Sequence, residues 1–398
     1  MDLTFTPEQD AFRAEARRWL EAHAPAPGGL ASMDTPAGFD QHRAWERTMA
    51  SDRWSVVSWP IEYGGRGADI VEWLIFEEEY YRVGAPRRVS QNGIFLLGPT
   101  LLAFGTDQQK SRFLPPMASG EEIWCQGWSE PDAGSDLAGI RSRAVRAEDG
   151  PADGGSGWRL TGQKTWCSRG AFADWCFGIF RTDPGAERHR GLTYFLVPMD
   201  APGVTVRPIA QLDGETGFAE VFFDDVFVPD AQVLGQAGEG WTVAMSTAGS
   251  ERGLSLRSPA RFTEAAERLV ALLADTVPGG DLARAGSLPD SVARAYIDAE
   301  AYRLHTYWTA SRVADGHAVG PEASCNKIFW SETDLAIHAT ALAVLGPDAE
   351  LLGTDGTTAV VPDWLDGYLF ALAGPIYAGT NEIQRNVVAE RLLGMPRG

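Results

Sequence analysis

The sequence predicts an α+β fold in which a β domain lies between two helical blocks. From residue 1 to about 120, apolar residues recur every three or four positions, which is the helical period. From 121 to 235 they alternate with polar residues or form short apolar runs, which favours strands. The helical period returns after Gly235. We therefore expect an N-terminal α-helical domain over 1–120, a central β domain over 121–235 and a C-terminal α-helical bundle over 236–398.

The N-terminal block is predicted to contain at least two amphipathic helices. Thr6 is placed to cap the first, and Pro7 suits its first turn because no helical hydrogen bond is lost there. Apolar residues repeat at helical spacing from Phe12 to Leu20 and again from Trp73 to Tyr81. The loop 59-WPIEYGGRGAD-69 separates the two patterns, because its proline and paired glycines break regular structure.

Four stretches of the middle block have the composition of strands: 158-WRLTGQKTW-166, 175-WCFGIFRT-182, 192-LTYFLVPM-199 and 218-FAEVFFDDVFV-228. The helical pattern that follows Gly238 to Gly240 is interrupted at 277-VPGGDLARAGSLPD-290, which is polar and rich in glycine and proline.

The composition excludes several classes of partner. With 54 acidic and 34 basic residues, the formal net charge is -20, which argues against binding to nucleic acid or to anionic membranes. No signal peptide and no apolar run of membrane-spanning length is visible, so we expect a soluble, cytoplasmic protein. The four cysteines lack metal-type spacing, and we expect free, buried thiols and no bound metal.

A carboxylate stands in an unusual place in 246-STAGSERGLS-255. At the helical period, Glu251 shares a face with Ala244, Thr247, Ala248 and Leu254, and none of these offers it a cation. Such a carboxylate is either solvated at the edge of a helix or placed against something flat.

Three further stretches suit a polar, planar or phosphorylated ligand, and each also fits an ordinary structural role. The turn in 124-WCQGWSEPDAGSD-136 gathers hydroxyls and backbone N–H groups, as a capped turn between strands also does. In 162-GQKTWCSRGAFADW-175, Trp166 and Ser168 alternate along a strand, either as a wall for an aromatic ring or as core residues. In 373-AGPIYAGTNEIQRNVVAERLLG-394, a turn of small residues precedes a helix, where Thr380 is a plain N-cap or part of an anion site.

In this order and spacing, the four stretches resemble the acyl-CoA dehydrogenase family along essentially the whole chain. The likeness also covers LTFTPEQDAFRAEARRWL, WPIEYGGRG, 98-GPTLLAFGTDQQKSRFLPPMASGE-121 and EVFFDDVFVP. The resemblance implies an FAD enzyme in which N-terminal helices, a central β-barrel-like domain and a C-terminal four-helix bundle enclose the flavin and a thioester, usually in a dimer or tetramer.

The resemblance also implies roles for individual residues. Residues placed against the isoalloxazine and its pyrimidine edge are Gln126, Trp128 and Ser129. Gly134 and Ser135 are implied near the flavin and the acyl-CoA, Trp166 beside the ring and Ser168 near N5. Thr380 and Glu382 match positions that contact the pyrophosphate and ribose.

The reaction implied by the family needs a base at the α carbon and donors for the enolate oxygen. Much of the family carries the base immediately before Gly-Thr, where this chain has Ala378. A smaller branch carries it on the first long helix of the C-terminal bundle, directly before an arginine, as in Glu251-Arg252. Glu251 is therefore the predicted base, with a pKa raised by desolvation, and the Ala378 N–H is predicted to hold the thioester oxygen. The alternative is that Glu251 pairs with a nearby arginine. Arg252 either anchors the helix or reaches the CoA.

Two departures from the family leave the assembly open. The Arg-x-x-Phe-Gly motif through which a neighbouring subunit grips the flavin is absent from 277–290, and Ala343 replaces a glutamine. We expect either a heterotetramer with a related chain or a homo-oligomer. The substrate is expected to be an acyl-CoA or carrier-protein thioester, and the electron acceptor an electron-transfer flavoprotein. Small residues at 248, 249 and 378 leave room for a branched, ring-bearing or polyketide-like acyl group. Alternative functions are a flavin monooxygenase or oxidase and a non-catalytic subunit.

Overall fold

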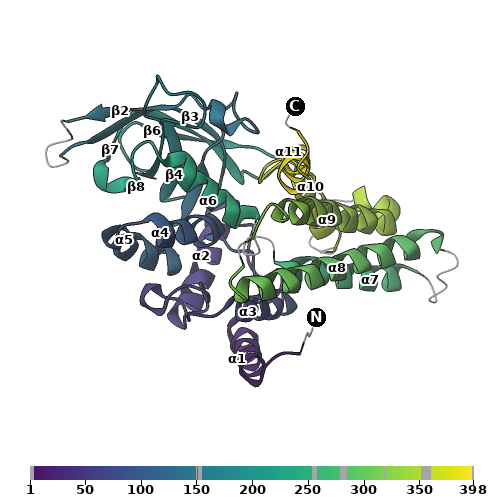
Figure 1. The fold of residues 1–398 in the computed structure, drawn as a ribbon. Helices are drawn as coiled ribbons and strands as arrows, with labels where there is room; N and C mark the ends of the chain where they lie inside the picture. The colour runs from purple at the N-terminus through teal and green to yellow at the C-terminus, as the bar shows by residue number, and fades with distance from the viewer. Residues whose placement is uncertain are drawn as a thin grey trace. The chain divides into compact units, whose positions relative to one another are not determined.

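The computed structural model describes residues 4–148, 150, 155–252, 258–277, 285–317, 319–350 and 360–396, without the side chains of 250–252 and 360–362. The chain forms two compact units (Figure 1). The helical unit consists of Met1–Leu20, Asp69–Val83 and Arg252–Gly398, and the sheet unit consists of Glu21–Ala68 and Gly84–Glu251. The predicted order of a helical block, a β block and a second helical block is confirmed. The domain boundaries after residues 120 and 235 stay predictions.

The described part of the sheet unit contains an eight-stranded mixed sheet. Its strands are β1 (Trp124–Gly127), β2 (Arg143–Ala147), β3 (Gly157–Ser168), β4 (Trp175–Arg181), β5 (Leu192–Pro198), β6 (Val204–Ile209), β7 (Phe218–Pro229) and β8 (Val233–Leu234). They lie in the order β6-β7-β3-β2-β4-β5-β8, and β1 pairs with β4 in parallel. The four runs predicted as strands are confirmed as β3, β4, β5 and β7.

Burial along β5 and β7 explains the two apolar patterns of the middle block. Residues 192–197 of β5 are all buried, as in a strand covered on both faces. In β7, every second residue is buried up to Phe223, and the alternation resumes one residue out of phase at Val226. The phase changes at a β-bulge against β3, where Asp225 has a φ of 55°.

Helices and short turns complete the sheet unit. The helices are α2 (Pro36–Ser51), α4 (Gly98–Phe104), α5 (Asp107–Ala118) and α6 (Gly240–Arg252), the last of which runs to the end of the unit. The 3-10 and π turns are η1 (Ile61–Tyr63), η2 (Asn92–Leu97), η3 (Leu137–Gly139) and η4 (Asp230–Gln232). Helix α5 begins at a capping box, in which Thr106 and Gln109 satisfy each other's backbone N–H groups.

The helical unit is a bundle (Figure 1). Its elements are α1 (Pro7–His23), α3 (Ile70–Arg82), α7 (Pro259–Thr276), α8 (Leu288–Ala314), α9 (Ala323–Leu345), η7 (Gly346–Glu350), α10 (Val360–Leu372), α11 (Asn381–Val387) and η8 (Val388–Leu392). The predicted cap at Thr6 is confirmed, since its hydroxyl accepts the N–H of Gln9 at 3.2 Å. Phe262 of α7 and Trp330 of α9 stack 6.3 Å apart in the core.

The predicted burial of the four cysteines holds for three of them. Cys125, Cys167 and Cys176 are free and buried as predicted, but Cys325 is free and exposed on α9, so its predicted burial was wrong. Cys325 lies one helical turn before Phe329, which is also exposed, so both side chains lie on the outer face of α9. Within the described ranges, no helix combines the length and apolar character needed to cross a bilayer.

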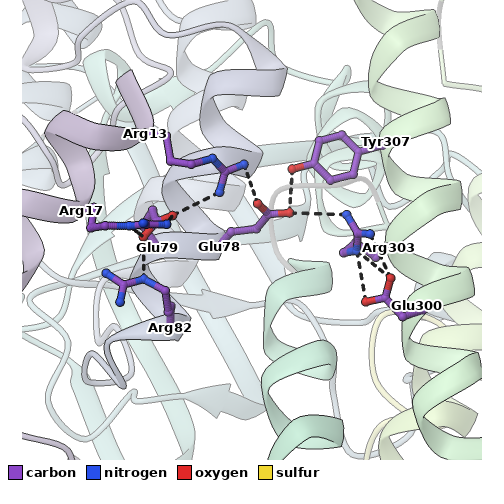
Figure 2. Close-up of polar contacts among 8 residues, drawn as sticks. All are labelled: Arg13, Arg17, Glu78, Glu79, Arg82, Glu300, Arg303 and Tyr307. Carbon is purple, nitrogen blue, oxygen red and sulfur yellow. Dashed lines mark hydrogen bonds and ion pairs between the residues drawn. The ribbon is translucent and has the colours of Figure 1, made fainter. Parts of the chain in front are cut away.

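Two neighbouring carboxylates of α3 tie distant parts of the helical unit together (Figure 2). Glu79 accepts hydrogen bonds from Arg13 at 3.1 Å, Arg17 at 2.8 Å and Arg82 at 2.7 Å, although its side chain is only 1% exposed. Glu78 accepts from the Tyr307 hydroxyl of α8 at 2.7 Å and pairs with Arg13 at 2.8 Å. These contacts join α1 and α8 through α3.

Glu79 makes the stability of the helical unit depend on pH. Burial raises the pKa of this carboxyl, but hydrogen bonds from the three arginines outweigh burial and lower the pKa to about 2. Because the unfolded value is about 4.3, ionised Glu79 stabilises the fold above that pH, and the contribution is lost as the pH falls toward the folded pKa. We expect Glu79→Gln to lower the free energy of unfolding at neutral pH by about 1–3 kcal/mol, and the difference from wild type to vanish at acidic pH.

Urea unfolding of both proteins from neutral pH down to about pH 2 checks this expectation. Asp10→Asn, at an exposed position early in α1, is the control and should remain within about 0.5 kcal/mol of wild type throughout. A Glu79→Gln deficit that is the same at every pH would contradict the role assigned to the carboxylate.

Candidate active site

The loop after β1 and the last part of β3 meet in the sheet unit. The backbone N–H of Thr165 donates to the Ser129 carbonyl at 2.9 Å. This contact brings together two groups of predicted site residues, which are Gln126, Trp128 and Ser129 on one side and Trp166 and Ser168 on the other. Gly134 and Ser135 follow on the same loop and are exposed. A Cβ added at Gly134 meets no atom within 4 Å, so packing does not require glycine there.

A buried ion pair holds this loop, and it was not predicted from the sequence. Lys164 of β3 is 0% exposed, and its Nζ donates to Glu130 at 2.7 Å and to the Trp128 carbonyl at 3.3 Å. Glu130 also accepts the N–H groups of Arg141 and Ser142 at 2.6 and 3.0 Å. Burial opposes ionisation of Glu130, but the Lys164 charge and these donors prevail and lower the pKa of the carboxyl. The ionised pair fixes the backbone on either side of Ser129.

Two tryptophans near this loop have opposite environments. Trp128 is 7% exposed and packs edge-on against Phe177 and Tyr194, with ring centroids 6.5 and 6.3 Å apart. Its Nε1–H is buried, and no described residue accepts a hydrogen bond from it. Trp166 is 58% exposed, which is unusual for so large a ring. A buried donor without an acceptor and an exposed indole are both features that a bound ligand would complete.

A bulge modifies the predicted relation between Trp166 and Ser168. The register of β3 against β7 slips between Lys164 and Cys167, and Trp166 has a φ of 57°. Strict alternation therefore does not hold along this part of the strand. Cys167 is nevertheless buried between two less buried neighbours, so Trp166 and Ser168 both lie on the outer side of the strand.

Buried hydroxyls anchor α6 one turn before position 251. The Thr247 hydroxyl lies 2.9 Å from that of Thr100 and 3.3 Å from that of Tyr194, and all three residues are buried. The same Tyr194 ring contacts Trp128. Tyr194 therefore contacts both α6, through Thr247, and the loop after β1, through Trp128.

The predicted base lies at the limit of what the structure describes. Ala244, Thr247 and Ala248 are buried, which confirms the predicted face of small residues. The backbone of α6 reaches Glu251 and Arg252, whose side chains lie outside the described residues, as does residue 254.

In the helical unit, the predicted turn before α11 has a left-handed backbone. The φ angles of Ala378 and Gly379 are 57° and 76°. Thr380 caps α11, since its hydroxyl accepts the N–H of Ile383 at 3.2 Å, and Glu382 is exposed on the first turn. The backbone N–H of Ala378 makes no hydrogen bond to a described residue.

Backbone strain singles out two of the predicted site residues. Among the described residues, six that are not glycine have a positive φ, and both Trp166 and Ala378 are in this group. Such conformations persist where surrounding contacts enforce them, and they cluster at functional sites.

A buried polar network lies under the Ala378 turn, and sequence reasoning missed it. The amide oxygen of Asn381 accepts from Lys327 Nζ at 2.7 Å and from the Ser331 hydroxyl at 3.1 Å. The side-chain amide of Gln384 donates to the carbonyls of Ala378 and Gly379 at 3.0 and 3.2 Å. Lys327 and Gln384 are both 0% exposed.

The lysines carried a signal that would have found both networks. The chain has three lysines, Lys110, Lys164 and Lys327, beside many arginines. Lys164 stands in a predicted strand, and Lys327 stands in an apolar helix, so neither position suits a solvated cation. Buried lysines need partners, and here those partners hold the two predicted ligand-binding turns.

Three family models match successive parts of the chain. They are described as the N-terminal, middle and C-terminal domains of acyl-CoA dehydrogenase and match residues 6–121, 125–226 and 238–393. Acyl-CoA dehydrogenase IpdE1 of Mycolicibacterium smegmatis is 38% identical over 98% of this chain and 98% of its own length. The chain belongs to the acyl-CoA dehydrogenase family.

Other relatives of this acyl-CoA dehydrogenase agree over the whole length. IpdE1 of Mycobacterium tuberculosis is also 38% identical, with 98% of both chains covered. A chain of the ChsE4-ChsE5 complex from Mycobacterium tuberculosis is 30% identical and superposes with a TM-score of 0.84 over 100% of both chains. The Tcur3481-Tcur3483 steroid ACAD is 29% identical, with a TM-score of 0.82 over 100% of both chains. The predicted fold is thereby confirmed.

Proposed function

We propose that this enzyme removes an α proton and a β hydride from an acyl thioester, with Glu251 as the base and FAD as the hydride acceptor. The observation that carries the proposal is the Ala378 turn, which offers a backbone N–H without a partner in the described chain and no carboxylate. Negative charge develops on the thioester oxygen as the α proton leaves, and a fixed N–H stabilises it. Since a methyl side chain cannot take the proton, the base must be another residue.

Glu251 is our candidate for that base. It precedes Arg252 at the end of α6, as in the family branch whose base lies on this helix. A carboxylate abstracts the α proton only from within hydrogen-bonding reach, so the anchoring of α6 through Thr247 contributes to catalysis in this proposal. Arg252 is assigned to the substrate.

The residues of the sheet unit fit a flavin. The buried Nε1–H of Trp128 suits an acceptor on the edge of the ring system, and the exposed indole of Trp166 suits its face. When bound, FAD supplies the acceptor for the hydride. We propose as its contacts Gln126, Trp128, Ser129, Gly134, Ser135, Trp166, Ser168, Thr380 and Glu382, with Ser135 also near the acyl chain.

We propose a ring-bearing acyl group, such as one derived from a steroid side chain. One similar structure is named a steroid ACAD, at 29% identity. Ala248 and Gly249, shortly before the end of α6, are small residues that leave room beside them. A CoA thioester is the proposed form, and a carrier-protein thioester would present the same phosphopantetheine arm.

We propose that FAD is held by a complex of this chain with a related chain. The arginine motif of homomeric members is missing, and two similar structures are named as paired components. This chain would supply Glu251, and the related chain would supply the arginine that binds FAD in homomeric members. We propose a cytoplasmic location and an electron-transfer flavoprotein as the acceptor of the electrons.

Flavin content and reduction test these proposals together. The chain is purified alone and after co-expression with a related acyl-CoA dehydrogenase chain, and its visible spectrum and mass are recorded. We expect flavin in the two-chain complex only, and bleaching of its band under anaerobic conditions by ring-bearing acyl-CoA thioesters. Stoichiometric flavin in the isolated chain would contradict the heteromer. Absence of flavin from both preparations would contradict the proposal that the protein is a dehydrogenase. Rapid oxygen consumption by the reduced protein would favour an oxidase.

A further inference from the structure

A fully buried glutamine holds the turn at Ala378. Gln384 lies on α11, the helix that follows this turn. Its Nε2 donates to the carbonyls of Ala378 and Gly379 at 3.0 and 3.2 Å. It is 0% exposed, so water does not compete for these hydrogen bonds. One amide group therefore fixes the carbonyls of two successive peptide units.

The Ala378 backbone needs such a restraint. A left-handed conformation costs a residue with a Cβ about 1–2 kcal/mol, and Ala378 adopts it with a φ of 57°. Without a restraint, the peptide units on either side of Ala378 would rotate toward the right-handed or extended regions. The direction of the Ala378 N–H would change with them.

The far end of the turn is held independently. The backbone N–H of Asn381 donates to the Pro375 carbonyl at 2.8 Å, and Lys327 and Ser331 of α9 hold the Asn381 side chain. With α11 fixed in this way, Gln384 becomes a rigid support for the carbonyls of Ala378 and Gly379.

Stability alone does not explain a glutamine at position 384. Its Oε1 is buried and has no donor among the described residues. An unsatisfied buried acceptor costs about 1–3 kcal/mol, which offsets the gain from the two hydrogen bonds. Gln384 therefore costs stability through its unsatisfied Oε1, and yet it holds the turn that is predicted to contact the thioester. This combination points to a functional role.

We propose that Gln384 is a positioning residue that sets the direction of the Ala378 N–H toward the thioester oxygen. This inference rests on the function proposed above. Gln384 itself touches no reacting atom; it acts through the backbone of Ala378 and Gly379. Misdirection of a single donor of this kind lowers the preference for the transition state about 10- to 100-fold.

The test compares Gln384→Met, which keeps the length of the side chain but removes both donors, with Ile383→Ala on the same helix. Binding to the FAD-loaded enzyme is measured by calorimetry for benzoyl-CoA, a thioester that has no α hydrogen and so cannot be oxidised, and for its thioether S-benzyl-CoA, which lacks the carbonyl. We expect the wild type and Ile383→Ala to prefer the thioester and Gln384→Met to lose about tenfold or more of that preference, with unchanged thioether affinity. Hydrogen exchange of the 375–381 peptide should accelerate in Gln384→Met only, and it is followed at the Tyr377 N–H, which directly precedes Ala378 and donates to the Ala373 carbonyl at 3.0 Å.

Each other outcome overturns the inference and identifies its cause. Unchanged hydrogen exchange would show that Gln384 does not hold the turn. Accelerated exchange with equal losses for thioester and thioether would show a structural role only. A wild type that binds both probes without preferring the thioester would refute the proposed role of the Ala378 N–H itself, whatever Gln384 does to the turn.

Discussion

Replacing Glu251 with glutamine is expected to slow reduction of the bound flavin by substrate about 10²- to 10⁴-fold, the contribution of a general base. The amide has nearly the shape of the carboxylate, so flavin content and ligand affinity should be retained. It cannot accept the α proton, which is too weakly acidic to leave without a base. Anaerobic single-turnover mixing, followed at the visible flavin band, measures this step apart from reoxidation and product release.

Two further variants make this test specific to position 251. Glu239→Gln, at an exposed carboxylate just before α6, should reduce flavin at the wild-type rate. Adding Ala378→Glu to Glu251→Gln places a carboxylate where the larger part of the family carries its base, and partial recovery is expected. If Glu251→Gln reduces flavin as fast as the wild type in a single turnover, the assignment of the base is wrong.

Replacing Lys164 with methionine is expected to lower the free energy of unfolding by about 3–5 kcal/mol, the cost of breaking a buried ion pair from one side. The side chains of Lys164 and Glu130 are 0% and 7% exposed, so water does not solvate the Glu130 carboxylate once Lys164 is replaced. No other cation in the described contacts pairs with Glu130. Glu130 keeps the N–H groups of Arg141 and Ser142, which places the expected loss toward the lower end of that range. Urea and thermal unfolding measure the change.

Lys110→Met provides a matched control for Lys164→Met. Lys110 lies half-buried on α5 and forms no ion pair among the described residues, so this variant should change stability by less than about 1 kcal/mol. The double variant Lys164→Met/Glu130→Gln should recover part of the loss, because no charge is then left unpaired. Equal stabilities of Lys164→Met and Lys110→Met would show that the pair contributes nothing.

The turns of the candidate site could be predicted from the sequence, but the buried side chains that support them could not. The turn at Ala378 and the cap at Thr380 follow from small residues before an amphipathic helix, which is a local pattern. The supports of that turn, Lys327 and Gln384, could not be assigned from local patterns, because their partners are set by how α9 and α11 pack. The same holds for Lys164, whose partner Glu130 stands 34 residues away in the chain.

By itself, the sequence determined the order of helical and β blocks, the four main strands, the caps at Thr6 and Thr380 and the family. These depend on period, turn residues and motif order, all of which are local or linear properties. Only the tertiary structure decided where alternation changes phase, as at Asp225 and Trp166, and which buried cations pair with which carboxylates and amides. A bulge depends on the partner strand and a buried charge on distant neighbours, and neither is written in the residues next to it.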